Sequence, residues 1–408
     1  MTPFLQLTLT LAIMITLAKL GGYLSFRFGQ PAVLGELLVG IILGPSILDF
    51  LHLSIFTDRH LQEVIQELAE LGVMMLMFLA GLELHLSELL KSTKVAVLAG
   101  ILGVLFPLLM GAGGGAIFAL ALKNALFLGL TLAATSVSIS AQTLMELNRL
   151  RSKIGFGLLG AAVFDDILVV LGLSIFTALA VDNATANASM GMIVNTLLRM
   201  GLFLAISSVI GYYLLPPLSL RIFSLEISQG LISFVFVTIL LFGWLADTLG
   251  KMAAITGAFL AGLWFARTTL KERIVTGIST IAYGIFVPIF FVDVGLNADV
   301  KTLLGSNFWL FFVLFLIAVF GKVIGAGLGA LLSGYSSLEA LQLGVGMMSR
   351  GEVGLIVASV GIADGYLTTA SFSAIVGVVI ATTLLTPPLL RYLVHREALS
   401  SKLIIERE

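Results

Sequence analysis

Cysteine is absent from this chain of 408 residues, and charged residues are scarce. The lack of thiols excludes disulfides, thiolate metal sites and cysteine nucleophiles. Only 11% of the residues are charged, against roughly 25% in a soluble domain, whereas 59% are hydrophobic. So few charges cannot cover so much apolar surface in water, which excludes a soluble enzyme. The net charge of -1 and the lack of a basic tract exclude a nucleic-acid-binding protein.

Long apolar runs fill most of the sequence. A membrane-spanning helix needs about 20 apolar residues, and cuts at charged or Gly/Pro/Asn-rich breaks predict thirteen such helices. The predicted spans are residues 4–25, 31–48, 62–85, 93–114, 125–146, 154–180, 190–220, 229–248, 252–267, 275–297, 306–333, 338–361 and 369–394. The predicted fold class is therefore an all-α polytopic membrane protein. We expect residues 1–408 to form a single membrane domain without a soluble regulatory domain.

Lysine and arginine are distributed unevenly between the two sides of the membrane. Fourteen of them lie in one set of loops and span ends, four lie in the other set, and four lie deeper within spans. Because cytoplasmic loops are enriched in Lys and Arg, this bias places the N-terminus outside and the C-terminus in the cytoplasm. The predicted location is the inner (plasma) membrane of the cell.

The chain also resembles itself at an offset of 214 residues. This offset aligns residues 78–92 with 291–306, and the fifth predicted span with the twelfth. Aligned spans are seven apart, an odd number, so the two copies would enter the membrane in opposite directions. Inverted repeats of this kind are common in secondary transporters, which bind their substrate near the middle of the membrane.

The fifth and twelfth predicted spans are poor continuous helices. Residues 132–142 place four hydroxyl side chains at the expected depth of the bilayer centre, namely Thr135, Ser136, Ser138 and Ser140. Residues 344–357 contain four glycines together with Arg350 and Glu352. Non-helical backbone at this depth survives inside protein or beside water, where hydroxyls and carbonyls can meet an ion. The sequence therefore predicts two discontinuous helices, although small residues also serve simple close packing of helices.

Three charged side chains lie near the middle of predicted spans. Asp165 and Asp166 lie in the sixth span, and each carboxylate costs about 2.5 kcal/mol or more at the centre of a bilayer. Successive helix positions differ by about 100° in direction, so one acid can hold a fixed cation and the other a mobile ion. Lys322 in the eleventh span is the candidate fixed cation, because a buried ammonium needs an acidic partner.

Other charged residues in the spans have a less specific interpretation. Arg350 and Glu352 are interpreted as a structural charge pair within or between the broken segments. Asp293 lies close to the aqueous end of its span, where it is either an interfacial carboxylate or a second acid that faces the ion.

Together these residues suit one kind of chemistry. A carboxylate in a restricted aqueous cavity holds a proton or a small cation, but not both at once. The hydroxyl groups of Thr135 and Ser136, with loosened carbonyls, could complete an oxygen shell around an alkali ion at Asp166. If only the loaded carboxylate crosses between the two sides, cations and protons are exchanged.

Four segments resemble a known family. They are residues 132–141 (LAATSVSISA), 160–170 (GAAVFDDILVV), 321–331 (GKVIGAGLGAL) and 347–358 (MMSRGEVGLIVA). Together they resemble the monovalent cation:proton antiporter-2 family, and most of all its NapA-type sodium/proton antiporters. The resemblance implies an NhaA/NapA-like fold with two crossed discontinuous helices, a homodimer, no cofactor and an elevator-like shift of a mobile core. The core would comprise residues 62–180 and 275–361, and the dimerisation scaffold residues 4–48, 190–267 and 369–394.

The resemblance also implies roles for individual residues. Asp166 matches the essential ion-binding carboxylate of the family. Asp165 matches the acid that forms a salt bridge, in electrogenic members, with the lysine matched by Lys322. Thr135 and Ser136 match the break in one crossed helix, and residues 349–352 match the break in the other. Asp293 departs from the NapA-type pattern, which leaves the ion preference open.

The predicted function is antiport of Na+ (or Li+) against protons, with the lipid bilayer and a second copy of the chain as partners. A K+/H+ antiporter or a Kef-like potassium efflux protein is the nearest alternative, but Kef-like proteins usually carry a cytosolic nucleotide-binding domain. A symporter of the related bile-acid type would use the same broken helices without the buried lysine. A membrane-embedded enzyme is disfavoured, because the sequence contains no recognisable nucleophile–base or metal-ligand set.

Overall fold

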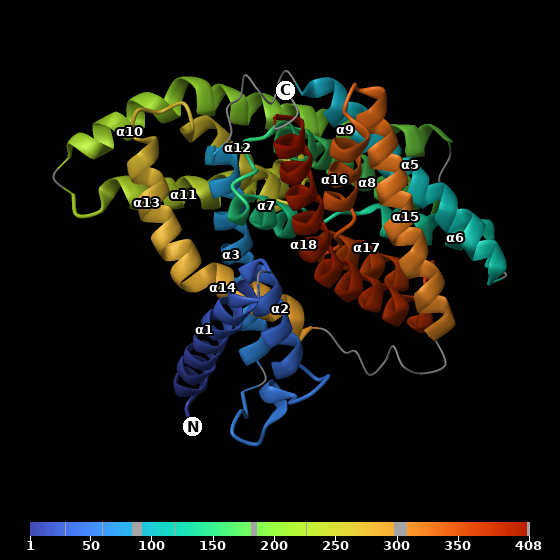
Figure 1. Cartoon of the computed structure of the whole chain (residues 1–408), viewed down its shortest axis with the longest axis horizontal. Coiled ribbons are helices and arrows are strands. Elements are labelled where there is room, and N and C mark those ends of the chain that lie inside the picture. The colour runs from blue at the N-terminus through green and yellow to red at the C-terminus, as the bar shows by residue number, and fades with distance from the viewer. Residues whose placement is uncertain are drawn as a thin grey trace. The chain divides into compact units, whose positions relative to one another are not determined.

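The computed structural model describes residues 1–28, 30–58, 60–83, 92–118, 120–180, 186–225, 227–297 and 308–405. The regular structure of these residues is helical throughout, without a strand (Figure 1). Ten helical stretches within these ranges are long and apolar enough to cross a membrane, judged by length and composition. The protein is therefore an all-helical, polytopic membrane protein.

The helices follow the apolar runs of the sequence. Their bounds are α1 Pro3–Arg27, α2 Ala32–Leu43, α3 Leu61–Glu83, α5 Thr93–Ile117, α6 Leu122–Ala133, α7 Val137–Glu146, α8 Lys153–Ala180, α9 Ala186–Val209, α10 Leu215–Ser224, α11 Gly230–Leu245, α12 Ala254–Phe265, α13 Lys271–Ile281, α14 Val287–Leu296, α15 Phe308–Leu332, α16 Ser337–Gly346, α17 Glu352–Ala363 and α18 Thr369–Ile405. A short 3-10 turn, η1, covers Phe50–His52.

Three predicted spans have no counterpart among these ten stretches. Span 31–48 contains only α2 and span 252–267 only α12, each of 12 residues, and span 338–361 is divided between α16 and α17. A helix of 12 residues rises about 18 Å, less than the roughly 30 Å of a hydrocarbon core. The number of thirteen spans therefore stays a prediction.

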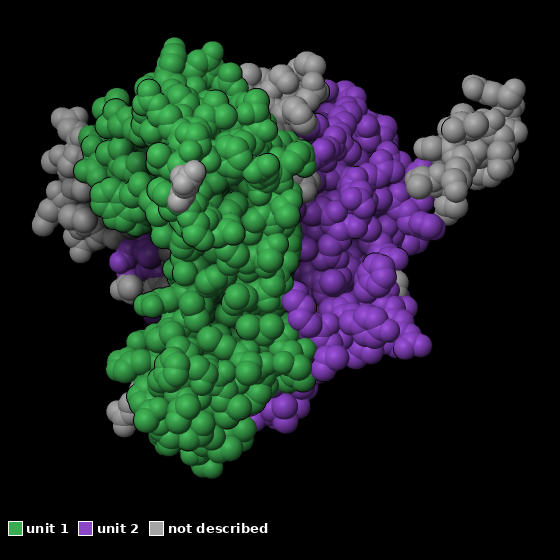
Figure 2. Space-filling model, turned by 90° about the vertical axis from the view of Figure 1, so that its left-hand side faces the viewer, with its two compact units in different colours: residues 1–18, 51–90, 170–293 green, residues 19–50, 91–169, 294–408 purple. Residues whose placement is uncertain are grey.

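The chain forms two compact units, which are coloured separately in Figure 2. Unit 1 comprises residues 1–18, 51–90 and 170–293, and unit 2 comprises residues 19–50, 91–169 and 294–408. Within unit 1, α3 and α12 pack closely through two glycines. A Cβ atom on Gly81 would clash with the carbonyl of Phe259, and one on Gly262 would clash with the carbonyl of Phe78. Small residues at these crossing points let the two backbones approach.

Unit 1 also contains π-helical turns within its apolar helices. They are η2 at Ile210–Leu214, η3 at Ala246–Gly250 and η4 at Ala282–Phe286. In a π turn the backbone bonds run to the fifth residue, so each turn accommodates one residue more than an α-helix. The helix that follows such a turn therefore presents a different face from the one that a continuous α-helix would present.

A stripe of glycines on α15 organises the packing of unit 2. Gly321, Gly325 and Gly329 lie four residues apart on one face of this helix, and they contact the backbone of α5. A Cβ atom on Gly325 would overlap the carbonyl of Leu102. Lys322 directly follows the first of these glycines, so the close approach of α5 and α15 buries its side chain.

Candidate functional site

The site lies in unit 2, where two interrupted helices meet. One interruption separates α6 from α7 between Ala133 and Val137, and the other separates α16 from α17 between Gly346 and Glu352. The amide of Ser136 donates to the carbonyl of Ser349 at 2.9 Å, and the Ser349 hydroxyl donates back to the carbonyl of Ser136 at 2.6 Å. The two breaks, more than 200 residues apart in the sequence, are therefore bonded to each other.

Hydroxyl side chains satisfy further backbone groups at this junction. Ser140 on α7 donates to the carbonyl of Gly346 at 2.5 Å, which ties α7 to the end of α16. The hydroxyl of Thr135 lies 3.5 Å from the carbonyl oxygen of Ala133 and 3.4 Å from that of Met347. Both distances are long for an O–H···O bond, whose usual length is about 2.7–2.8 Å. The hydroxyl of Thr135 therefore bonds these two carbonyls only weakly.

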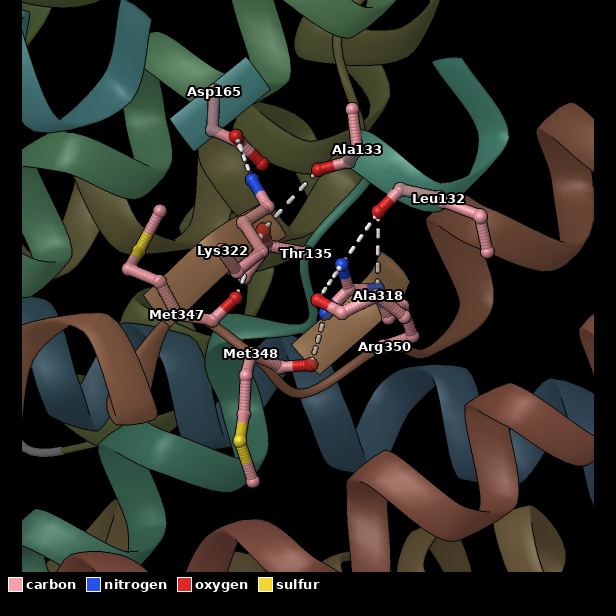
Figure 3. A network of polar contacts seen from close by, with 9 residues as sticks. All are labelled: Leu132, Ala133, Thr135, Asp165, Ala318, Lys322, Met347, Met348 and Arg350. Atoms are coloured by element: carbon pink, nitrogen blue, oxygen red, sulfur yellow. Dashed lines mark hydrogen bonds and ion pairs between the residues drawn. The ribbon is translucent and has the colours of Figure 1, made fainter. Parts of the chain in front are cut away.

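The structure brings Lys322 of α15 and Asp165 of α8 together as an ion pair between Nζ and Oδ1 (Figure 3). Both side chains are fully buried. Taking a carboxylate and an ammonium out of water costs several kcal/mol each, so each is stable there only with the other as partner. The second oxygen of Asp165, Oδ2, accepts no hydrogen bond from any residue that the structure describes.

Asp166, the next residue on α8, has different surroundings. Its side chain is partly exposed, whereas Asp165 is completely buried. Adjacent positions on an α-helix point about 100° apart. The aspartate pair therefore consists of one carboxylate that Lys322 neutralises and one that is partly exposed.

Arg350 lies at the centre of the polar network beside this pair. Its guanidinium donates twice to the carbonyl of Leu132, at 3.1 and 2.6 Å, once to that of Ala318 at 2.8 Å, and once to that of Met348 (Figure 3). The carbonyls at the end of a helix lack partners within that helix and carry partial negative charge. Arg350 thus satisfies a carbonyl in the last turn of α6 and one that lies just after the end of α16.

The predicted pair of Arg350 and Glu352 has no counterpart among these contacts. The side chain of Glu352 lies outside the part of the chain that the structure describes, so the pair stays a prediction. The described partners of the Arg350 side chain are backbone carbonyls, and a sequence contains no sign of them.

Sequence reasoning did not single out the hydroxyls of α18. Thr383 donates to the carbonyl of Arg350 at 2.7 Å, and Thr382 accepts from the Arg350 amide at 3.3 Å. Both threonines are buried on an otherwise apolar stretch of the helix. The only signal in the sequence is the Thr-Thr pair at 382–383 near the middle of the last predicted span.

Asp293 belongs to the other compact unit. It is buried near the end of α14 and is the last residue of unit 1, whereas the network around Lys322 belongs to unit 2. Its interpretation as an interfacial or an ion-facing acid stays open.

The last residue of α7, Glu146, is also acidic. Glu146 accepts from the amides of Ala32 at 2.6 Å and Val33 at 3.3 Å, and thus caps the N-terminus of α2. Glu36 on the same short helix is buried and lies 3.4 Å from the ammonium of Lys19, which is half exposed. These contacts fix α2 against α7 within unit 2.

The network beside α8 and α15 contains oxygen atoms of the kinds that bind small cations. Carboxylate, hydroxyl and carbonyl oxygens are the ligands that hard cations take in proteins. Asp166 has a partly exposed carboxylate, Asp165 has a buried oxygen without a hydrogen bond, and the Thr135 hydroxyl lies beside two carbonyls. A proton and a metal ion compete for such a carboxylate, because the ligand must be deprotonated to bind the metal.

Comparisons with known proteins agree with this chemistry. Residues 12–395 match the profile of a family described as sodium/hydrogen exchanger, transmembrane. The chain is 38% identical over 382 residues to the Na(+)/H(+)-K(+) antiporter GerN of Bacillus cereus, a match that covers 94% of this chain and 95% of the relative. It is 36% identical over 382 residues to a Na(+)/H(+) antiporter of Enterococcus hirae, which covers 94% and 96% of the two chains.

A solved structure shows the same fold at low sequence identity. The sodium proton antiporter MjNhaP1 from Methanocaldococcus jannaschii superposes with a TM-score of 0.72 over 96% of both chains, at 19% identity. With the profile covering nearly the whole sequence, this protein belongs to the sodium/hydrogen exchanger family.

Proposed function

We propose that the protein is a secondary active antiporter that exchanges Na+ for protons, with Asp166 as the carboxylate that binds either ion in turn. The observation that carries the proposal is the fully buried pair of Lys322 and Asp165 beside the meeting point of two interrupted helices. Intramembrane charges of this kind mark ion pathways, because a purely structural role does not compensate their insertion cost. The cation/proton antiporters among the relatives support the same reaction.

The roles of the residues follow from their positions. Asp166 is the accessible acid and would exchange Na+ for a proton. Asp165 and Lys322 would keep one negative charge permanently compensated, so that an entering cation meets one carboxylate rather than two. Thr135 and Ser136 lie at the break between α6 and α7 and would add hydroxyl or carbonyl oxygens to the shell of the ion.

Finer features of the proposal rest on the resemblance to NapA-type members of the monovalent cation:proton antiporter-2 family. They are a homodimer, thirteen spans with an outer N-terminus and a cytoplasmic C-terminus, and an elevator-like movement of residues 62–180 and 275–361. The Asp165–Asp166 pair together with Lys322 supports an electrogenic cycle, in which more protons than sodium ions move.

A second candidate is K+/H+ exchange. It is favoured by the relative GerN, whose name includes K+ beside Na+. The two candidates differ in the size of the ion that the oxygen shell accepts, and a side-by-side comparison of ions separates them.

The test uses purified protein in liposomes that contain a pH-sensitive dye. We expect an imposed Na+ gradient to change the internal pH, with Li+ active and K+ weaker; a stronger response to K+ would favour the second candidate. No response to any of the three ions contradicts antiport.

Asp166→Asn should reduce exchange to the level of empty liposomes. The purified variant should elute in size-exclusion chromatography at the same volume as the wild-type protein. Full activity in this variant would show that the ion binds elsewhere.

A further inference from the structure

The guanidinium of Arg350 contacts three backbone segments at the junction of the two interrupted helices. It reaches the carbonyls of Leu132 on α6, Met348 after α16 and Ala318 on α15, and its own side chain is 1% exposed. Each contact is a hydrogen bond from a charged donor, which is about twice as strong as a neutral one. Three separate backbone segments are thus joined at one side chain.

The contact of Arg350 with α15 links this residue to Lys322. Ala318 lies four residues before Lys322, so its carbonyl lies one helical turn away, where the backbone amide of Lys322 also bonds. The position of Arg350 is therefore coupled to the position of the Lys322 ammonium. Among the residues that the structure describes, Asp165, Asp166 and Arg350 are charged groups close enough to act electrostatically on Lys322.

The backbone of Arg350 is fixed from the other side by α18. The hydroxyls of Thr382 and Thr383 bond to its amide and its carbonyl, so the residue cannot shift without breaking buried bonds. Because both its backbone and its guanidinium are hydrogen-bonded, Arg350 keeps α18 and the segments that its guanidinium contacts at a fixed separation. Lysine could not replace it, because an ammonium is a compact donor on a flexible stem and lacks the planar fork.

We propose that Arg350 is a positioning residue: it ties the ends of the two interrupted helices to α15 one turn before Lys322, and thereby sets how closely the Lys322 ammonium approaches the acids of α8. This role deepens the proposed function and depends on it. A change at Arg350 that keeps its charge should then alter the competition between protons and cations, and not only the stability of the fold.

The main test compares Arg350→Lys with wild type in the liposome assay. We expect the pH of half-maximal exchange to move by about one unit. We also expect the KM for Na+ to rise by about tenfold with a smaller change in kcat, because displaced ligands weaken ion binding first. Arg199→Lys makes the same chemical change at an exposed position of α9 and should leave both quantities unchanged. A folded Arg350→Lys protein with the wild-type pH profile and KM overturns the proposal.

Thr383→Val provides a second variant if Arg350→Lys does not fold. It removes only the hydroxyl that holds the Arg350 carbonyl. We expect the pH of half-maximal exchange to move by less than one unit, with a KM for Na+ raised roughly threefold. An unchanged profile in a Thr383→Val protein overturns the positioning role.

Hydrogen exchange separates failure of this inference from failure of the proposed function. The Ser136 amide bonds across the junction to Ser349, so it reports whether the breaks remain joined. Faster exchange of this amide in Arg350→Lys or Thr383→Val, but not in Arg199→Lys, supports the positioning role even if wild-type liposomes transport none of the ions. Wild-type exchange rates in both junction variants overturn it, whatever the transport assay shows.

Discussion

The pairing of Lys322 with Asp165 explains why two neighbouring acids can coexist within a membrane helix. One carboxylate of the aspartate pair is compensated by an ammonium that water does not reach, and the other is left accessible. Two ionised acids without such a partner would repel each other and take up protons. In the proposed function, the fixed pair would keep Asp166 available for a mobile ion.

Removal of Lys322 should destabilise the protein strongly. Lys322→Gln leaves the Asp165 carboxylate buried without its partner, which costs about 3–5 kcal/mol. We expect a lower midpoint of thermal unfolding in detergent, and a partial recovery in the double variant Asp165→Asn/Lys322→Gln, which removes both charges.

Lys153→Gln is the control for this change. Lys153 pairs with Glu339 at 2.9 Å, but it is half exposed, and exposed ion pairs contribute only about 0–1 kcal/mol. Equal effects of the two lysine substitutions would contradict the buried pair.

At the scale of single residues, the sequence indicates the charged groups whose burial costs free energy, but it does not indicate all of their partners. Asp165, Asp166 and Lys322 stand out because charge in an apolar run demands an explanation. The partners of Arg350 and the threonines of α18 do not, because the acceptors of Arg350 are backbone carbonyls that every residue carries. Backbone contacts become visible only once the chain has folded.

The glycine stripe of α15 is what allows the charged pair to be buried. With Gly321, Gly325 and Gly329 against α5, the two helices approach closely enough to cover Lys322. In the sequence, these glycines stand out only as part of the family motif at residues 321–331. The sequence does not show that they pack against α5.

Gly325→Val should loosen this helix pair. Its branched side chain would overlap the carbonyl of Leu102, and overpacking of a close contact costs about 1–3 kcal/mol. We expect lower thermal stability together with reduced exchange activity. Gly113→Val in α5 adds the same side chain where no atom lies within 4 Å of a new Cβ, so it should change neither. Equal stability of the two variants would argue against close packing at the stripe.

Helix boundaries were predictable where an apolar run ends at charged or polar residues, as at α1 and α15. The interruptions of α6–α7 and α16–α17 were predictable from hydroxyls and glycines at membrane depth. The π turns were not, because an added residue in a helix leaves no compositional sign. The cap of α2 by Glu146 was missed for another reason: its partners lie 113 and 114 residues away along the chain.

The molecule as a whole should show competition between its two substrates. If one proton excludes one Na+ from Asp166, the apparent KM for Na+ should rise by about tenfold for each unit of falling pH on the acid side. The maximal rate at saturating Na+ should change much less. A KM that stays constant over this range would mean that the two ions bind at separate sites.

An elevator-like movement makes a further prediction for the contact of α2 with α7. The expected scaffold includes Ala32 and the expected core includes Glu146, yet these residues are bonded in this structure. A cross-link between Ala32→Cys and Glu146→Cys by a reducible bismaleimide should therefore stop exchange, and reduction should restore it. The chain has no native cysteine, so each single variant treated with the same reagent is a clean control. Undiminished exchange in the cross-linked protein would show that α2 and α7 travel together.

The π turn η4 also has a consequence for the acid at position 293. Deleting one residue between Ala282 and Phe286 would return this stretch to ordinary α-helical winding and rotate all of α14 by about 100°. The Asp293 carboxylate would then point from another side of its helix, although the amino acid itself stays the same. The direction in which the Asp293 carboxylate points thus depends on the number of residues in the π turn before α14.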